Sequence, residues 1–216
     1  MAPELKEQEK ETIQRAEKAI TDKAALAELL AGILAKNDEI REPSFKALLH
    51  ISETHPEVLY PHWEYFAGLL VSKNTYLKYE AIYLIARLTI ADTSRKFERI
   101  FETYYELLDD KSVIPASHAA LNSGKIARAK PHLRTRITDR LLRIDDTHHE
   151  PERRELIKSY AIEAFDEYFE GADDEDKKMI LEFVRGQVAS SSPKTRKKAK
   201  AFLKTWDQSK SRTGDK

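Results

Sequence analysis

One cluster in the sequence, His148-His149-Glu150, combines side chains that can bind a metal ion. Zinc and iron sites need three or four ligands that converge on one point, and adjacent histidines on a helix point in different directions. We therefore interpret this segment as a solvated loop and predict no metal site and no cofactor. The chain has no cysteine, which excludes disulfides, thiolate metal sites and cysteine nucleophiles. Gly-x-Ser-x-Gly and glycine-rich phosphate loops are also absent, so we predict no catalytic residues.

A run of basic residues near the C-terminal end is the best local candidate for binding a phosphate or an acidic partner. The candidate anion-binding residues are Arg196, Lys197, Lys198 and Lys200, and Lys194 and Lys204 flank them. The alternative is a solvated face, because the terminal repeat of a stacked array needs a polar exterior.

Charge is balanced over the whole chain, with 37 basic and 37 acidic residues, but it is strongly segregated. Residues 111–143 carry eight basic and one acidic side chain, whereas residues 145–176 carry three basic and thirteen acidic ones. A nucleic-acid groove needs one sign of charge along its length, because its affinity comes from neutralising successive phosphates. The acidic segment interrupts such a track, so we favour a protein partner and keep a nucleic acid as the alternative.

The apolar residues recur at helical spacing along nearly the whole chain, as in Leu26, Leu29, Leu30 and Ile33. Glycine and proline are few, which argues against the many tight turns of an all-β fold. We predict helices over residues 4–20, 23–35, 57–71, 95–108, 131–144 and 174–188. The last five each precede another helix of a recurring type.

That second type of helix is an internal repeat, and its clearest mark is a column of small residues. Five copies begin at residues 40, 77, 113, 157 and 195. The interval from 113 to 157 is 44 residues, longer than the other three, so we place an insertion at residues 145–155. A helix that packs closely on its pair-mate cannot carry a large side chain at the crossing point. The small residues at that position are Ser44, Ala81, Ser117, Ala161 and Ala199.

The repeating helical hairpin resembles the HEAT repeat family and its armadillo relatives. The residues that carry the resemblance are Leu59, Pro61, Leu69, Leu70 and Asn74, followed by Leu77, Lys78, Ala81, Leu84, Ile85 and Leu88, together with Ile40-Arg41 and Thr195-Arg196. The resemblance implies an all-α fold, a right-handed α-α superhelix (α-solenoid) of about five HEAT-like hairpins. We expect a capping helix at 1–21, units at about 22–54, 55–92, 93–130, 131–171 and 172–206, and a polar, disordered tail at 207–216.

The resemblance also raises two enzymatic alternatives. HEAT-like deoxyhypusine hydroxylases carry several His-Glu pairs for a di-iron centre, whereas this chain has only His149-Glu150. HEAT-like DNA glycosylases present aromatic residues to DNA, and Trp63 and Trp206 are the candidates here. We expect Trp206 to occupy the buried column of the fifth repeat and Trp63 to lie in a first helix, and an aromatic residue at helical spacing is more often part of the core. We predict a non-enzymatic protein, with a glycosylase-like activity as the main alternative.

HEAT-like arrays usually serve as binding scaffolds, and their second helices line the concave side. We therefore predict that the chain holds a segment of a protein partner on that face. The candidate partner-binding residues are Tyr76, Tyr79, Tyr83, Arg87, Lys46 and His50. The alternative is that the tyrosines lie over neighbouring helices and expose only their hydroxyl groups. No apolar run is long enough to cross a bilayer and no signal peptide begins the chain, so we predict no membrane contact and a cytoplasmic location.

Overall fold

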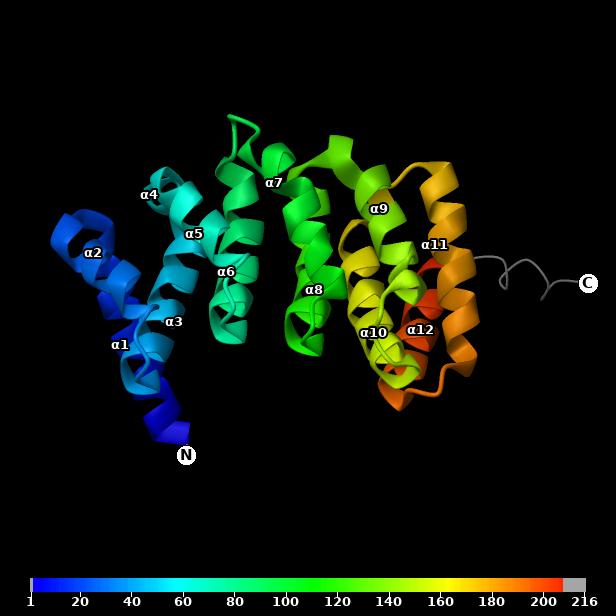
Figure 1. Ribbon diagram of the computed structural model, residues 1–216, viewed down its shortest axis with the longest axis horizontal. Coiled ribbons are helices and arrows are strands. Elements are labelled where there is room, and N and C mark those ends of the chain that lie inside the picture. Colours follow the sequence, from blue (N-terminus) through cyan, green and yellow to red (C-terminus); the bar gives the residue numbers. More distant parts are fainter. Residues whose placement is uncertain (1, 208–216) are drawn as a thin grey trace, which may run out of the picture. The chain divides into compact units, whose positions relative to one another are not determined.

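The computed structural model describes residues 2–207, with side chains from residue 7 onward (Figure 1). Every regular element in this range is helical, which confirms the all-α prediction. The chain divides into two compact units, Met1–Ile100 and Phe101–Lys216. None of the helices in the described range is both long and apolar enough to span a membrane.

The first unit consists of paired helices, and helices α3 and α6 lie side by side within it. Helix α1 packs on α2 and α3, as expected of a capping helix. The helix predicted at 57–71 is split by a 3-10 turn at Tyr60–His62, where Pro61 has no N–H to donate to a continuous helix. The elements are α1 (Ala2–Thr21), α2 (Lys23–Gly32), α3 (Asp38–Thr54), α4 (Pro56–Leu59), α5 (Trp63–Leu69) and α6 (Thr75–Leu88).

In the second unit, α8, α10 and α12 lie side by side, while α9 and α11 pack on each other, α9 also packs on α8 and α10, and α11 packs on α12. Short 3-10 turns end several of these helices, including η3 (Glu106–Asp109) and η5 (Ile144–Asp146). Helix α7 runs across the boundary between the units. The helices are α7 (Lys96–Tyr105), α8 (Val113–Ala129), α9 (Arg134–Leu142), α10 (Pro151–Tyr168), α11 (Asp174–Gly186) and α12 (Pro193–Trp206).

Most of the second helices begin at a polar capping residue from a segment that the sequence marks as a turn. Asn74 Oδ1 accepts a hydrogen bond from the backbone N–H of Tyr76 at 2.9 Å, which satisfies one of the free donors of the first turn. The residues that cap α3, α6, α8 and α12 in this way are Asn37, Asn74, Ser112 and Ser192. These caps explain why the hairpins break where they do.

The small-residue column is buried in all five repeats, and glycines extend the same close packing. A Cβ atom on Gly32 would lie 2.1 Å from Ser44 Oγ, so α2 can approach α3 this closely only with glycine there. A Cβ atom on Gly124 of α8 would lie 3.0 Å from the Ala164 carbonyl oxygen of α10. Ile40, the apolar residue at which the first copy of the repeat begins, is not buried in this way and is 52% exposed.

Hydrogen bonds between side chains and neighbouring hairpins fix the stacking register. Tyr65 donates its hydroxyl hydrogen to the Leu30 carbonyl at 2.6 Å, and Thr195 donates to the Glu155 carbonyl at 2.6 Å. These partners are 35 and 40 residues apart, close to one repeat. Each bond joins one hairpin to the next and satisfies a polar group at the contact between them.

The division into five hairpin units with a separate cap and tail stays a prediction, although the helix order agrees with it. The predicted tail lies outside the described residues except for Asp207. That residue accepts a hydrogen bond from Arg185 Nε at 3.0 Å and is therefore held against α11.

Candidate functional site

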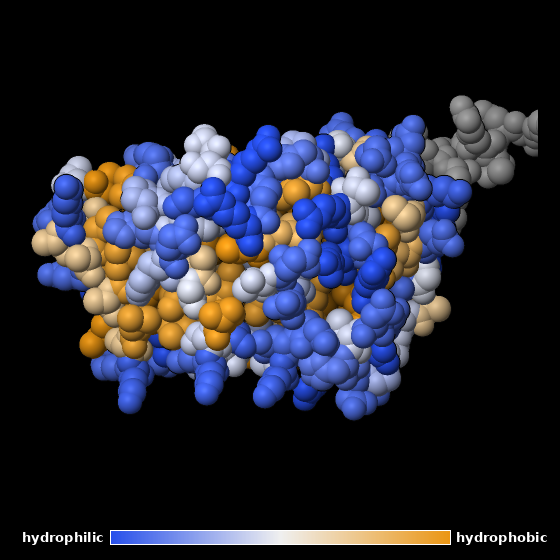
Figure 2. Space-filling model, turned by 45° about the horizontal axis from the view of Figure 1, so that its top comes forward, coloured by the Kyte–Doolittle hydropathy of each residue, from blue (hydrophilic) through white to orange (hydrophobic). Residues whose placement is uncertain are grey.

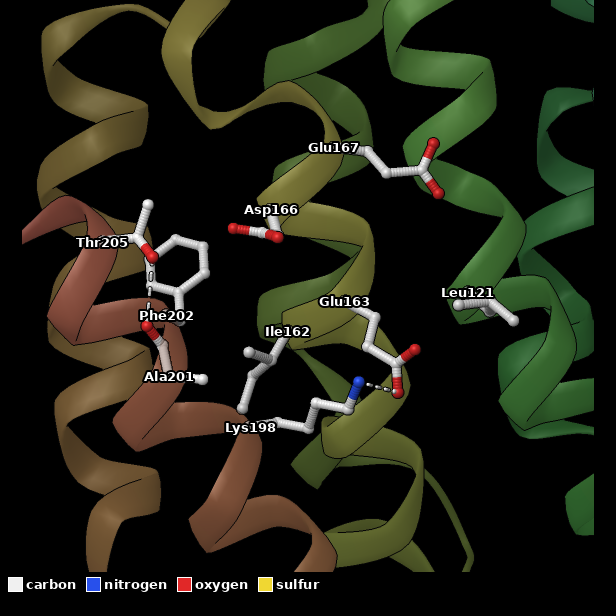
Figure 3. A pocket seen from close by; sticks show the side chains of 9 residues that line it. All are labelled: Leu121, Ile162, Glu163, Asp166, Glu167, Lys198, Ala201, Phe202 and Thr205. Carbon is white, nitrogen blue, oxygen red and sulfur yellow. Dashed lines mark hydrogen bonds and ion pairs between the residues drawn. The ribbon is translucent and has the colours of Figure 1, made fainter.

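A solvent-open groove in the second unit is lined by the side chains of α8, α10 and α12 (Figure 3). Its volume is about 340 Å³. Glu163, Asp166 and Glu167 of α10 face it together because residues three and four apart share one face of a helix. We call this site the acidic groove and define it by those three carboxylates with Ile162, Lys198 and Phe202.

Each carboxylate of the acidic groove pairs with a side chain of a neighbouring helix. Glu163 Oε1 lies 3.2 Å from Lys198 Nζ, and Asp166 Oδ1 accepts a hydrogen bond from Trp206 Nε1 at 2.6 Å. Glu167 Oε1 lies 3.5 Å from Lys125 Nζ on α8. A carboxylate has about four lone-pair sites, so each of these groups keeps acceptor capacity toward the groove.

The floor of the acidic groove is apolar and is packed on an aromatic cluster. Ile162 and Phe202 are buried beneath the carboxylates. Phe202 packs edge-on against Phe169 with ring centroids 5.1 Å apart, and Trp206 lies 5.1 Å from the same Phe169 ring. Aromatic pairs of this geometry add to the stability gained from burying their surface. The groove therefore combines a negative rim with a fixed hydrophobic base.

The two tryptophans occupy different environments. Trp63 is fully buried in the first unit and cannot stack on a base. The expectation that Trp206 lies in a buried column is wrong, because this side chain is only half-buried and its indole N–H reaches Asp166. The cause is its position in the last turn of α12, where Asp166 on α10 supplies a hydrogen-bond acceptor.

The predicted tyrosine surface lies on α6 and faces α3. Tyr76 is 59% exposed, whereas Tyr79 and Tyr83 are half-buried with their ring centroids 4.9 Å apart. Phe45 of α3 packs edge-on against both, at 5.8 Å from Tyr79 and 6.4 Å from Tyr83. Three tyrosines therefore do gather, but two of them also hold α3 and α6 together.

Two other predicted members of this surface, Arg87 and Lys46, pair with acidic residues of the chain. Arg87 Nε donates to Glu53 Oε1 at 2.9 Å, and its guanidinium lies 5.6 Å from the Tyr83 ring centroid. Lys46 Nζ lies 2.7 Å from Glu42 Oε1. Lys46 and His50 line a shallow groove of about 490 Å³ between α1 and α3. Their role in partner binding stays a prediction.

Two of the four predicted anion-binding residues of α12, Arg196 and Lys198, have partners within the chain. Arg196 Nη1 donates to the carbonyls of Ser190 and Ser191 at 2.6 and 3.0 Å, so it fastens the loop before α12. Lys198 points into the acidic groove, as Figure 3 shows, while Lys197 and Lys200 are exposed. The basic residues of α9 are also engaged, since Arg136 and Arg140 both pair with Glu102.

The loop that contains His148 and His149 is not simply solvated. His149 is only 4% exposed, so the solvated-loop prediction is wrong for this residue. The two histidine rings lie 4.5 Å apart, and Asp109 lies beside them. Sequence reasoning missed Asp109 because it is 39 residues away in the chain, in the turn that closes the preceding hairpin.

The structure resembles solved repeat proteins. It matches a designed armadillo repeat protein in complex with the peptide (KR)4, with a TM-score of 0.58 and 17% identity over 91% of this chain and 90% of that one. It also aligns with an engineered protein, with a TM-score of 0.48 and 16% identity over 91% and 88% of the two chains. No protein-family model matches the sequence, and no curated protein matches it. The first likeness shows the fold, an all-α armadillo-like solenoid.

Proposed function

We propose that the protein is a non-enzymatic binding module that holds a basic, extended segment of a partner protein in the acidic groove. The observation that carries this proposal is the row of Glu163, Asp166 and Glu167 above an apolar floor. The three carboxylates come from two adjacent turns of one helix, at positions i, i+3 and i+4, so their spacing is fixed by the helix itself. A peptide with cationic side chains along its length can therefore pair with these carboxylates in a single alignment.

Lysine and arginine fit both parts of this groove. Their charged ends pair with carboxylates, and their aliphatic stems cover apolar surface. Leu121 and Ala201 also line the groove, are less buried than Ile162 and Phe202, and supply that surface. The designed armadillo repeat protein of similar fold was solved with a peptide of alternating lysine and arginine, which supports a basic peptide as the kind of ligand to test.

A nucleic acid fits the acidic groove poorly, because its phosphates would meet three carboxylates. The nearby basic residues give it little compensation. Lys198 is paired with Glu163, and Arg136 and Arg140 are paired with Glu102. Nucleic-acid binding, with or without glycosylase activity, remains the alternative to the peptide-binding proposal, and the cytoplasmic location remains a prediction.

Fluorescence anisotropy with a labelled (KR)4 peptide tests the proposal. We expect saturable binding that weakens as salt rises, because part of the affinity is screened electrostatic attraction. The triple variant E163Q/D166N/E167Q should bind roughly tenfold more weakly, since each partly exposed charge pair contributes about 0.2–1 kcal/mol. A poly-glutamate peptide of the same length and a DNA duplex should not bind.

The matched control is Glu152→Gln, which removes an exposed carboxylate from the same helix outside the groove. It should leave the peptide affinity unchanged. If the triple variant binds (KR)4 as tightly as the unchanged protein, the acidic groove is not the binding site. If duplex DNA binds more tightly than the peptide at the same salt concentration, the nucleic-acid alternative replaces the proposal.

A further inference from the structure

Asp109, His148 and His149 form a compact cluster that peptide binding in the acidic groove does not use. Asp109 lies at the end of η3, and the two histidines lie in the loop between η5 and α10. The backbone N–H of His148 donates to Asp109 Oδ1 at 2.7 Å, and the His148 ring nitrogen Nδ1 lies 2.6 Å from the same oxygen. The cluster therefore joins the turns of two successive hairpins.

His149 is the unusual member of the cluster. Its side chain is buried, and its Nε2 atom is buried without a hydrogen-bond partner. The ring is also hydrogen-bonded to the backbone of Leu108. Because Nε2 makes no such bond, the bond to Leu108 involves Nδ1, which then carries the proton and leaves a lone pair on Nε2. A buried polar atom without a partner costs free energy, so this nitrogen needs a ligand.

We propose that Asp109, His148 and His149 bind one divalent transition-metal ion of the zinc class. Each residue offers one nitrogen or oxygen atom, and these three atoms lie within 4.8 Å of one another. Two imidazoles and one carboxylate are ligands that Zn²⁺ accepts in a tetrahedral site, with water in the fourth position. Mg²⁺ and Ca²⁺ prefer oxygen ligands and fit this cluster less well.

The surroundings of His149 match those of a metal-binding histidine. Such histidines usually donate the second ring N–H to a backbone carbonyl or a carboxylate, which fixes the ring orientation. The contact with Leu108 has that character.

The geometry needs only a small adjustment to close around an ion. Ligand atoms about 2.0–2.1 Å from a tetrahedral zinc lie roughly 3.4 Å apart. His148 and Asp109 are both exposed, so they can move toward the fixed His149. A bound ion would link η3 to the loop before α10.

Isothermal titration of the tag-free full chain with ZnCl₂ at pH 7.5 tests the site. We expect one ion per chain with a Kd in the micromolar range or below. Asp109→Asn and His148→Ala alter exposed side chains that leave the core intact, and each should weaken binding at least tenfold. His149→Ala should weaken it at least as much. Co²⁺ should give a d–d absorption spectrum that Asp109→Asn diminishes.

The matched control is His55→Ala, which removes an exposed histidine from the first unit and should leave zinc binding unchanged. Zinc should also raise the Tm of the unchanged protein and not that of the double variant D109N/H148A. If His149→Ala fails to fold, that double variant decides the question. Zinc binding that is absent, weaker than about 100 µM, or equal in the double variant and the unchanged protein would overturn the proposal.

Discussion

The indole N–H of Trp206 donates a hydrogen bond to Asp166 Oδ1 at 2.6 Å and so ties the last turn of α12 to the groove-facing side of α10. The two residues are 40 positions apart, about one repeat. The same bond occupies part of a carboxylate that we propose as a peptide ligand. Trp206 therefore links the stability of the terminal hairpin to the electrostatics of the acidic groove.

Trp206→Phe separates these two effects. Phenylalanine keeps an aromatic ring against Phe169 but cannot donate to Asp166, so we expect the free energy of unfolding to fall by about 1 kcal/mol. Asp166 would then have more capacity for an external cation, and (KR)4 should bind as tightly as before or more tightly. Urea denaturation measures the free energy of unfolding, and fluorescence anisotropy measures the affinity for (KR)4. Weaker peptide binding in a fully folded Trp206→Phe variant would show that the indole itself contacts the peptide.

Gly124→Ala tests the close approach of α8 and α10. The new Cβ would lie 3.0 Å from the Ala164 carbonyl oxygen, so one helix backbone must shift. We expect a net loss of about 1–2 kcal/mol, because overpacking costs about 1–3 kcal/mol and helix propensity returns up to about 1 kcal/mol. Chemical denaturation measures the change.

Gly68→Ala is the matched control, since a Cβ at this position in α5 meets nothing within 4 Å. It should stabilise the protein by up to about 1 kcal/mol through helix propensity alone. Equal effects of the two substitutions would mean that α8 and α10 are not in close contact at Gly124.

Glu80 should make stability depend on pH. It is 3% exposed, its Oε1 lies 3.4 Å from Arg41 Nε, and its Oε2 has no hydrogen-bond partner. Burial raises the pKa of Glu80 to about 7 from an ordinary value of 4.5, although the charge of Arg41 opposes the shift. The folded protein therefore keeps this proton between pH 4.5 and 7, where the unfolded chain has lost it.

Stability from this group is thus greatest below pH 4.5 and is lost as the pH rises through 7. The loss amounts to about 2–3 kcal/mol between pH 5 and 8. Glu80→Gln cannot ionise, so its unfolding free energy should be flatter over that range. Denaturation at pH 5, 6, 7 and 8 measures how the free energy of unfolding changes with pH in the unchanged protein and in Glu80→Gln. Parallel slopes for the two proteins would exclude a raised pKa at this position.

Two tyrosines of the predicted partner surface should differ in their effect on stability. Tyr83 packs against Phe45, Tyr79 and Arg87, so Tyr83→Ala should cost about 2–3 kcal/mol. Tyr76 is mostly exposed and its ring lies 4.5 Å from the Arg41 guanidinium, so Tyr76→Ala should cost less than about 1 kcal/mol. Thermal unfolding of both variants measures the difference. Tyr76→Ala is therefore the substitution that can test partner binding without unfolding the protein. Equal losses of stability in Tyr76→Ala and Tyr83→Ala would contradict this prediction.

The amphipathic spacing of the chain was sufficient to predict the helices, because helix formation depends on nearby residues. The column of small residues is also visible in the sequence, because the two helices of each hairpin cross at the same position of the repeat and leave no room there for a large side chain. Ser44 and Ala161 are buried as this pattern requires. The split between α4 and α5 was missed, although Pro61 signals it.

The candidate sites were decided by contacts between hairpins. The sequence singled out His148 and His149 but not Asp109, and it placed Trp206 in a buried column rather than beside Asp166. Local periodicity determines which residues share one helix face, and this much the sequence alone fixes. Which side chain of the next hairpin faces them depends on stacking register and loop path, and only the tertiary structure sets these, through packing between residues about 40 positions apart.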